Sequence, residues 1–316
     1  MSAATEARVL HRPQAAHRYL PEGPKALGPA RLLWLTIQCG ADATQGALHV
    51  LTTGRGENRS WRLPGRPGFA YPTQREDVFL VGMERAVGLF DTGRARFQPL
   101  CDGLDANVPG TIVNDGVLLP QGLVFGAKDT SFQAHKAGLW FLRASDRQLF
   151  QLRSDMLCSN GVLGRPMLDG RIELFHIDSP LRVVKRFVLD PDQGALTDEA
   201  VAIDLRHDPA VPDGMVAWPG SDDVVVAMFD PGPRANGRAL RCSLRTGAVL
   251  AEFQTPGAAQ VTCPAWLETQ YGAHLVLTTA AENLTAERLA QQPNAGCLFA
   301  VRTPGVVVPQ TPVWLG

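Results

Sequence analysis

The segment NDGVLLPQGLVFGAKD (residues 114–129) contains the pattern that decides the fold. A turn rich in Asn, Asp and Gly opens the unit, an apolar run follows, and a second turn leads to another apolar run. Similar units recur along the chain and open with EGP at 22–24, GFAYP at 68–72, SNG at 159–161, PDGM at 212–215 and TCPAW at 262–266. Short apolar runs separated by such turns predict β-strands.

Each unit also closes with a candidate hairpin, in which apolar residues alternate on both sides of a turn. The six hairpins begin at Ala47, Ala86, Gly138, Leu181, Ala239 and Cys297. Their spacing is irregular but lies near the roughly 40–50 residues expected for a four-stranded propeller blade. We therefore predict an all-β fold, a six-bladed β-propeller with four-stranded blades, formed by residues 1–316 as a single domain.

Two further elements are predicted outside the blades. Residues 1–20 form an N-terminal segment, and residues 7–10 should pair as an outer strand with the last blade, because an open propeller would leave unpaired strand edges. Helix is scarce. One short helix is expected over residues 285–291, with Thr285 as its N-cap.

Composition and charge exclude several classes of protein. Hydrophobic residues make up 45% of the chain and charged residues 19%, which excludes a disordered protein. The net charge is −1 and no basic stripe is interleaved with aromatics, which argues against nucleic acid as a partner. No apolar run is long enough to cross a membrane, and no secretory signal is recognisable. We expect a cytoplasmic protein, monomeric or a small homo-oligomer, that acts on a small molecule.

The six cysteines do not predict a disulfide framework, because none forms a C-x-x-C pair and the chain is too large to need cross-links. Reduced and mostly buried thiols are expected. Cys158 and Cys263 lie beside unit openings and so near the expected channel. Neither is predicted to be a nucleophile, because no base and orienting group accompany them in the sequence.

The polar residues at the unit openings predict a metal site. The innermost strand of each blade lines the central channel, so residues from distant openings become neighbours there. Glu22, Asn160 and Asp213 would supply oxygen ligands only, which favours Ca²⁺, Mg²⁺ or Mn²⁺, with Zn²⁺ as a less suitable ion. Asn and Asp before Gly also form turns. That interpretation explains each motif alone but not their recurrence at unit openings.

The chain resembles the senescence marker protein, gluconolactonase and luciferin-regenerating enzyme family, which includes regucalcin. The resemblance spans nearly the whole chain and rests on the order and spacing of short motifs rather than on any one of them. These are EGP at 22–24 with LLWLTI at 32–37, NDG at 114–116 with GLVFGAKD at 122–129, CSNGV at 158–162 with LFHIDSP at 174–180, VPDGM at 211–215, CPAW at 263–266 with LVLTTAAENL at 275–284, and QQPNAGCLFAV at 291–301.

The resemblance implies a six-bladed propeller with one divalent metal ion in its channel and, usually, hydrolysis of a sugar-acid lactone. By motif, the family's metal ligands correspond to Glu22, Asn160 and Asp213. Asn114 corresponds to a substrate-contacting asparagine. The resemblance also suggests Asp213 as the base that activates water.

The departures from the family concern the substrate. Ile112 stands where an arginine is typical, Leu119 stands where an aspartate often precedes the proline, and the segment containing Lys128 and Asp129 lacks the usual acidic residues. We expect Ile112, Lys128 and Asp129 to contact substrate beside Asn114, with Lys128 able to pair with an anionic group. Two alternatives stay open: a hydrolase of apolar or aromatic lactones, esters or organophosphates, and a metal-binding propeller without catalysis.

Loops at the same face as the unit openings should form the rim of the pocket. They are expected near residues 127–137, 178–181, 229–238 and 279–294. Loops of this kind carry specificity while the rigid strands carry the ion. The candidate contacts on them are Phe132, His135, Phe229, Arg234 and Asn283.

Overall fold

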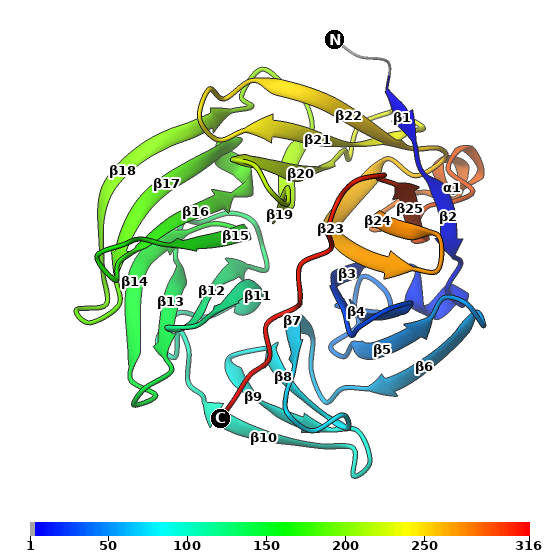
Figure 1. The fold of residues 1–316 in the computed structure, drawn as a ribbon. Helices are drawn as coiled ribbons and strands as arrows, with labels where there is room; N and C mark the ends of the chain where they lie inside the picture. Colours follow the sequence, from blue (N-terminus) through cyan, green and yellow to red (C-terminus); the bar gives the residue numbers. More distant parts are fainter. Residues whose placement is uncertain (1–3) are drawn as a thin grey trace.

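The computed structural model describes residues 4–316 and is built almost entirely from antiparallel β-sheets. The sheets are arranged in a ring, in chain order (Figure 1). This all-β, propeller-like arrangement agrees with the predicted fold class. No helix within residues 4–316 is long and apolar enough to cross a membrane.

Four of the sheets have four strands each. In chain order they consist of β3 (Pro21–Ala26), β4 (Arg31–Thr36), β5 (Ala47–Thr52) and β6 (Glu57–Arg62); β7 (Pro67–Pro72), β8 (Val78–Met83), β9 (Ala86–Asp91) and β10 (Arg96–Cys101); β11 (Thr111–Leu119), β12 (Gly122–Asp129), β13 (Ala137–Arg143) and β14 (Leu149–Met156); and β15 (Ser159–Pro166), β16 (Ile172–Asp178), β17 (Val183–Asp190) and β18 (Ala195–Asp204).

The fifth sheet has nine strands and two parts. One part contains β19 (Val211–Ala217), β20 (Asp223–Phe229), β21 (Gly237–Ser243) and β22 (Val249–Thr255), with the short β1 (Thr5–Glu6) parallel to β22. The other contains β23 (Gln260–Thr269), β24 (Gly272–Ala280), β25 (Leu298–Arg302) and β2 (Arg8–His11). A single residue pair, Phe229 with Gln260, joins the two parts.

Five of the six predicted outer hairpins are present, and the sixth is wrong. Residues after β25 form no strand, because Pro304 and Pro309 interrupt the run and cannot donate to a ladder. The N-terminal strand β2 instead pairs antiparallel with β25 and takes the outer position. The predicted short helix is confirmed as α1 (Ala286–Gln291), whose N-cap Thr285 accepts a hydrogen bond from Arg288 N.

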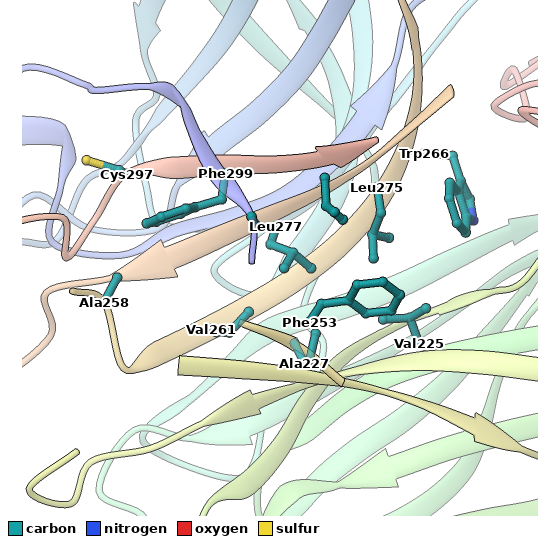
Figure 2. Close-up of a cluster of buried hydrophobic side chains, with 13 residues drawn as sticks. Val225, Ala227, Phe253, Ala258, Val261, Trp266, Leu275, Leu277, Cys297 and Phe299 are labelled. Atoms are coloured by element: carbon teal, nitrogen blue, oxygen red, sulfur yellow. The ribbon is translucent and has the colours of Figure 1, made fainter. Parts of the chain in front are cut away.

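The hydrophobic core lies between neighbouring sheets rather than in the channel. Figure 2 shows one such layer, where Val225, Ala227 and Phe253 face Leu275 and Leu277 across the junction of the nine-stranded sheet. All of these side chains are buried. The inner strands β20 and β24 are buried along most of their length, because both of their faces are covered by a neighbour, whereas the outer strand β22 is only partly buried.

The C-terminal segment after β25 crosses one face of the ring (Figure 1). Trp314 anchors its end: the side chain is buried among the core residues around Phe69 and Tyr71, and its backbone N–H donates to Pro72 O at 2.9 Å. The thiols are all free, as predicted; Cys158, Cys242, Cys263 and Cys297 are buried.

Candidate functional site

A β-bulge in the first strand of each unit creates the functional region. The ladder shifts register at the opening motif in β3, β7, β11, β15, β19 and β23. The expectation that these motifs are turns before the strands is therefore wrong. A bulge places two residues opposite one, bends the strand and re-aims side chains, which explains why Asn, Asp and Gly recur there.

Glycines in these bulges let the first strands of adjacent sheets approach closely. A Cβ on Gly161 would lie 2.5 Å from Ile177 Cδ1 and 2.7 Å from the carbonyl oxygen of Asp213. The φ of Gly161 is +21°. Side chains are excluded at this position by both space and backbone conformation. Gly161 thereby holds β15 directly against the strand that carries Asp213.

Four of the six openings, in β3, β11, β15 and β19, converge on a cavity of about 160 Å³. The predicted ligands Glu22, Asn160 and Asp213 all line it, and the predicted substrate contacts Asn114 and Lys128 line it as well. The remaining lining residues are Leu20, Ile37, Phe132, Cys158, Ser179, Val211, Phe229, Pro231 and Glu282. Distant parts of the sequence therefore meet at one face of the ring, including Phe132 and Phe229 from the expected rim loops.

The two asparagines are fixed by hydrogen bonds. Asn114 Nδ2 donates to Asn160 Oδ1 at 2.7 Å and to Ser159 O at 2.9 Å. Asn160 Nδ2 donates to Ser179 Oγ at 2.8 Å. Both amide nitrogens thus have partners in the protein. The orientation of each amide follows from these contacts, and it leaves Asn114 Oδ1 without a donor among residues 4–316.

Two of the carboxylates in the cavity, Glu22 and Asp213, have raised pKa values in the metal-free protein. Burial and the negative charge of Asp115 raise the pKa of Glu22 to about 8, although Gly23 N donates to Glu22 Oε2 at 2.7 Å. Burial, followed by the charge of Glu22, raises the pKa of Asp213 well above its ordinary value. When both are ionised, the Glu22 and Asp213 carboxylates give the buried cavity a negative potential, which a bound cation would neutralise.

This donor set fits a hard divalent cation. It offers two carboxylates and an amide oxygen, without imidazole or thiolate at the same place. Within the described part of the chain, no three His, Cys, Asp or Glu residues cluster to hold a metal on their own. Any ion at this site would therefore depend on the amide oxygen of Asn160.

Five of the candidate substrate contacts do not line the cavity: Ile112, Asp129, His135, Arg234 and Asn283. Ile112 is buried in β11, opposite Lys128 in the ladder with β12. Leu119, from which an apolar substrate pocket was also expected, lines a different cavity of about 260 Å³ at the other end of the channel, beside Tyr71 and Lys25. Because β11 runs along the channel, its two ends reach opposite faces of the ring.

Asp129 anchors a loop instead of reaching the cavity. Its carboxylate accepts hydrogen bonds from Ser131 Oγ and from the backbone N–H groups of Gln133 and Ala134, at 2.8 to 3.0 Å. Lys136 Nζ lies 3.1 Å from Asp129 Oδ1. Burial acts to raise the pKa of Asp129, but these hydrogen bonds outweigh it and lower the pKa below its ordinary value. The anchored loop carries Phe132 to the cavity.

Sequence reasoning missed Glu282 and Ser179. Both belong to rim loops that were expected, but neither residue has a local pattern that distinguishes it from a solvated loop residue. The structure identifies Ser179 through its bond to Asn160 and Glu282 through its place on the cavity wall. Cys158 also lines the cavity, and burial raises the pKa of its thiol to about 12, so it is protonated near neutrality, in agreement with the prediction that it is no nucleophile.

Comparison with known proteins places this geometry in context. The sequence model of the SMP-30/Gluconolactonase/LRE-like region matches residues 20–281. The chain is 28% identical over 275 residues to a 6-deoxy-6-sulfogluconolactonase of Pseudomonas putida, which covers 85% of this chain and 88% of that protein. It is 31% identical over 201 residues to regucalcin of Danio rerio, covering 63% of this chain and 64% of that one.

Solved structures share the fold. A calcium-binding protein, regucalcin, from Agrobacterium tumefaciens superposes with a TM-score of 0.81 over 99% of both chains at 21% identity. A luciferin-regenerating enzyme gives 0.78 over 98% of this chain and 99% of its own, at 17% identity. A gluconolactonase from Xanthomonas campestris gives 0.62 over 94% and 90%, at 14% identity.

Proposed function

Because this chain belongs to the SMP-30/gluconolactonase/LRE-like family, we propose that it is a metal-dependent lactonase acting at the cavity of Glu22, Asn160 and Asp213. Lactone hydrolysis is supported by the gluconolactonase-like family and by the sulfogluconolactonase relative. The observation that carries the proposal is the convergence of two buried carboxylates and a hydrogen-bonded amide pair in one cavity.

The proposed architecture is a six-bladed propeller in one domain. Four sheets each account for one blade. The nine-stranded sheet supports two more, because only the Phe229–Gln260 pair joins its parts and each part repeats the order of the other blades. In the last blade, β2 supplies the outer strand and closes the ring.

The proposed metal ligands are Glu22, Asn160 and Asp213, with Ca²⁺ the first choice and Mg²⁺, Mn²⁺ or Zn²⁺ the alternatives. The calcium-binding regucalcin supports this choice by its fold. When bound, a divalent ion polarises the lactone carbonyl and stabilises the charge that develops on its oxygen. Asn114 would orient the substrate through Oδ1, since its amide nitrogen is already bonded to Asn160 and Ser159.

Asp213 is the proposed base. As the oxygen of a water molecule bonds to the carbonyl carbon, an Asp213 carboxylate oxygen takes the proton. The C–O bond of the ring then breaks, and the proton returns to the departing ring oxygen, so that lactone and water give a hydroxy acid. Burial raises the pKa of Asp213 in the metal-free protein, and a bound cation would lower it again. The proposed role as base therefore rests on the place of Asp213 in the cavity rather than on a raised pKa.

A second candidate substrate class is favoured by the apolar part of the cavity wall. Six of the lining residues are apolar: Leu20, Ile37, Phe132, Val211, Phe229 and Pro231. They would accommodate an alkyl or aromatic lactone or ester on the same site. Hydrolysis of these substrates would use the same proposed metal and base and would differ only in the substrate group that contacts the apolar wall.

The test is hydrolysis by chelator-treated protein, measured by proton release with each metal added back. The panel should contain aldonolactones, alkyl lactones and aryl esters. Asp213→Asn, which keeps the size and one oxygen donor, should bind metal more weakly and lose turnover, while Asp169→Asn in an exposed turn serves as the matched control. Tight metal binding without hydrolysis of any compound would favour a non-catalytic metal-binding propeller.

A further inference from the structure

Lys128 brings a cation to the cavity in a defined position. It is the last residue but one of β12, paired with Ile112 in the ladder on one side and bridged to Cys158 on the other. The next residue, Asp129, anchors the following loop. The backbone of Lys128 is therefore fixed on both sides, and its side chain lines the cavity beside Glu22 and Asp213.

The ammonium group has no carboxylate within ion-pair distance. Among residues 4–316, every ion pair within 4.0 Å involves other cations, including the neighbouring Lys136 with Asp129. Lys128 Nζ instead lies 6.0 Å from the centre of the Phe132 ring. This contact is a weak cation–π interaction at best and leaves the donors of the ammonium group available.

The acids of the cavity would not neutralise the charge of Lys128 once a metal is bound. The charges of Glu22 and Asp213 together balance a divalent ion, so they no longer need Lys128. Glu282 is the other acid on the wall, and it lies farther than 4.0 Å from the Lys128 ammonium. The Lys128 ammonium group therefore lies at the cavity with no carboxylate within ion-pair distance.

The rest of the wall is poorly equipped to bind a neutral polyol. The amide nitrogens of Asn114 and Asn160 donate within the protein, whereas the Ser179 hydroxyl, which accepts from Asn160, keeps its own O–H as a donor. Most other lining groups are apolar. Few donors remain for sugar hydroxyls, so a charge-assisted hydrogen bond to Lys128 would be the strongest recognition contact outside the metal.

We propose that Lys128 forms a subsite for an anionic group on the substrate, and that the preferred substrates are lactones carrying a carboxylate, sulfonate or phosphate away from the ester. This inference rests on the proposed lactonase function. Lys128 acts in it as a specificity-determining residue, while the proposed metal ligands and Asp213 perform the chemistry on charged and neutral lactones alike.

The test uses two lactones that differ only in charge: 5-oxotetrahydrofuran-2-carboxylate and the corresponding carboxamide. The wild-type protein should have the higher kcat/KM with the carboxylate, mainly through a lower KM. Lys128→Met should lower kcat/KM for the carboxylate about 10- to 100-fold, the range expected for a hydrogen bond to a charged group. The loss with the carboxamide should be clearly smaller, because it carries no charge for Lys128 to bind. Lys128→Arg should keep most of the preference.

Lys185→Met is the matched control, since it removes the same charge from β17 far from the cavity, where Lys185 pairs with Glu199. It should leave both substrates unaffected. Equal rates of the two lactones in the wild-type protein, or an equal loss of both in Lys128→Met, would overturn the inference while leaving the lactonase function intact.

If neither lactone reacts with any metal, the proposed function fails, and calorimetry decides about the subsite separately. Titration of the two lactones into metal-loaded wild-type and Lys128→Met protein measures their binding without turnover. A preference for the carboxylate that disappears in Lys128→Met supports the anionic subsite. No difference between the lactones, or between the proteins, refutes it.

Discussion

Gly161→Ala should disturb the candidate site through the backbone alone. The new methyl group would lie 2.5 Å from Ile177 Cδ1 and 2.7 Å from the carbonyl oxygen of Asp213, and the residue would keep a φ of +21°. Overpacking of this kind costs about 1–3 kcal/mol. A positive φ adds about 1–2 kcal/mol for a residue with a Cβ. The free energy of unfolding should therefore fall by about 2–5 kcal/mol.

Gly170→Ala separates the two contributions. Gly170 also has a positive φ, +86°, but a Cβ there would meet nothing within 4 Å. This variant should lose only the conformational part, about 1–2 kcal/mol. Urea unfolding of the metal-free proteins measures both values, and calorimetry with Ca²⁺ measures the effect on the site. Because Gly161 abuts the backbone of Asp213, only Gly161→Ala should weaken Ca²⁺ binding.

Equal unfolding free energies for Gly161→Ala and Gly170→Ala would refute the close-packing argument. It would mean that β15 and β19 separate at little cost and that the bulge does not position Asp213. Reduced stability together with unchanged Ca²⁺ affinity would have a narrower meaning. The packing argument would hold, but Asp213 would not be a ligand.

Three further predictions concern charge and the two ends of the chain. Burial raises the pKa of Glu22 to about 8, so in metal-free protein this group stabilises the fold at low pH and loses that contribution as pH rises from about 4.5 to about 8. Unfolding measured as a function of pH should show this decline in the free energy of unfolding. Because Ca²⁺ binds the ionised carboxylate, its binding at pH 7 should release protons. Deleting residues 1–12 should lower the melting temperature by several degrees, because β25 would lose its outer partner; an unchanged value would dismiss the role of β2 in closing the ring. Trp314→Ala should cost about 3–5 kcal/mol of unfolding free energy and, by proteolysis, expose residues 303–316, whereas resistance to cleavage would show that the segment is held elsewhere.

The repeating sheets were predictable because turns and apolar runs recur along the sequence at similar spacing. Each unit needs turns and apolar strands at similar spacing, and five outer hairpins were found from this pattern alone. The sixth was wrong because the run after Cys297 is apolar enough for a strand, but Pro304 and Pro309 interrupt it and β2 takes the outer position beside β25. Apolar pattern does not indicate which of two segments occupies an edge.

The site was less predictable than the sheets, for two reasons. Asn and Asp before Gly are typical of turns and of bulges alike, so the sequence identified Glu22, Asn160 and Asp213 without the geometry that brings them together. Asp129 was misjudged because a loop anchor and a substrate contact have the same residue type. Its role depends on backbone N–H groups of Gln133 and Ala134, which side-chain identity does not indicate.

The pairing of β2 with β25 has a consequence for how the protein is made. The ribosome synthesises residues 8–11 long before their partners at 298–302. Contacts so distant in sequence form slowly, and until then β2 is an unpaired strand on a growing chain, open to aggregation or to a chaperone. A chain that ended before β25 would therefore form the four four-stranded sheets, but its ring could not be closed by the pairing of β2 with β25.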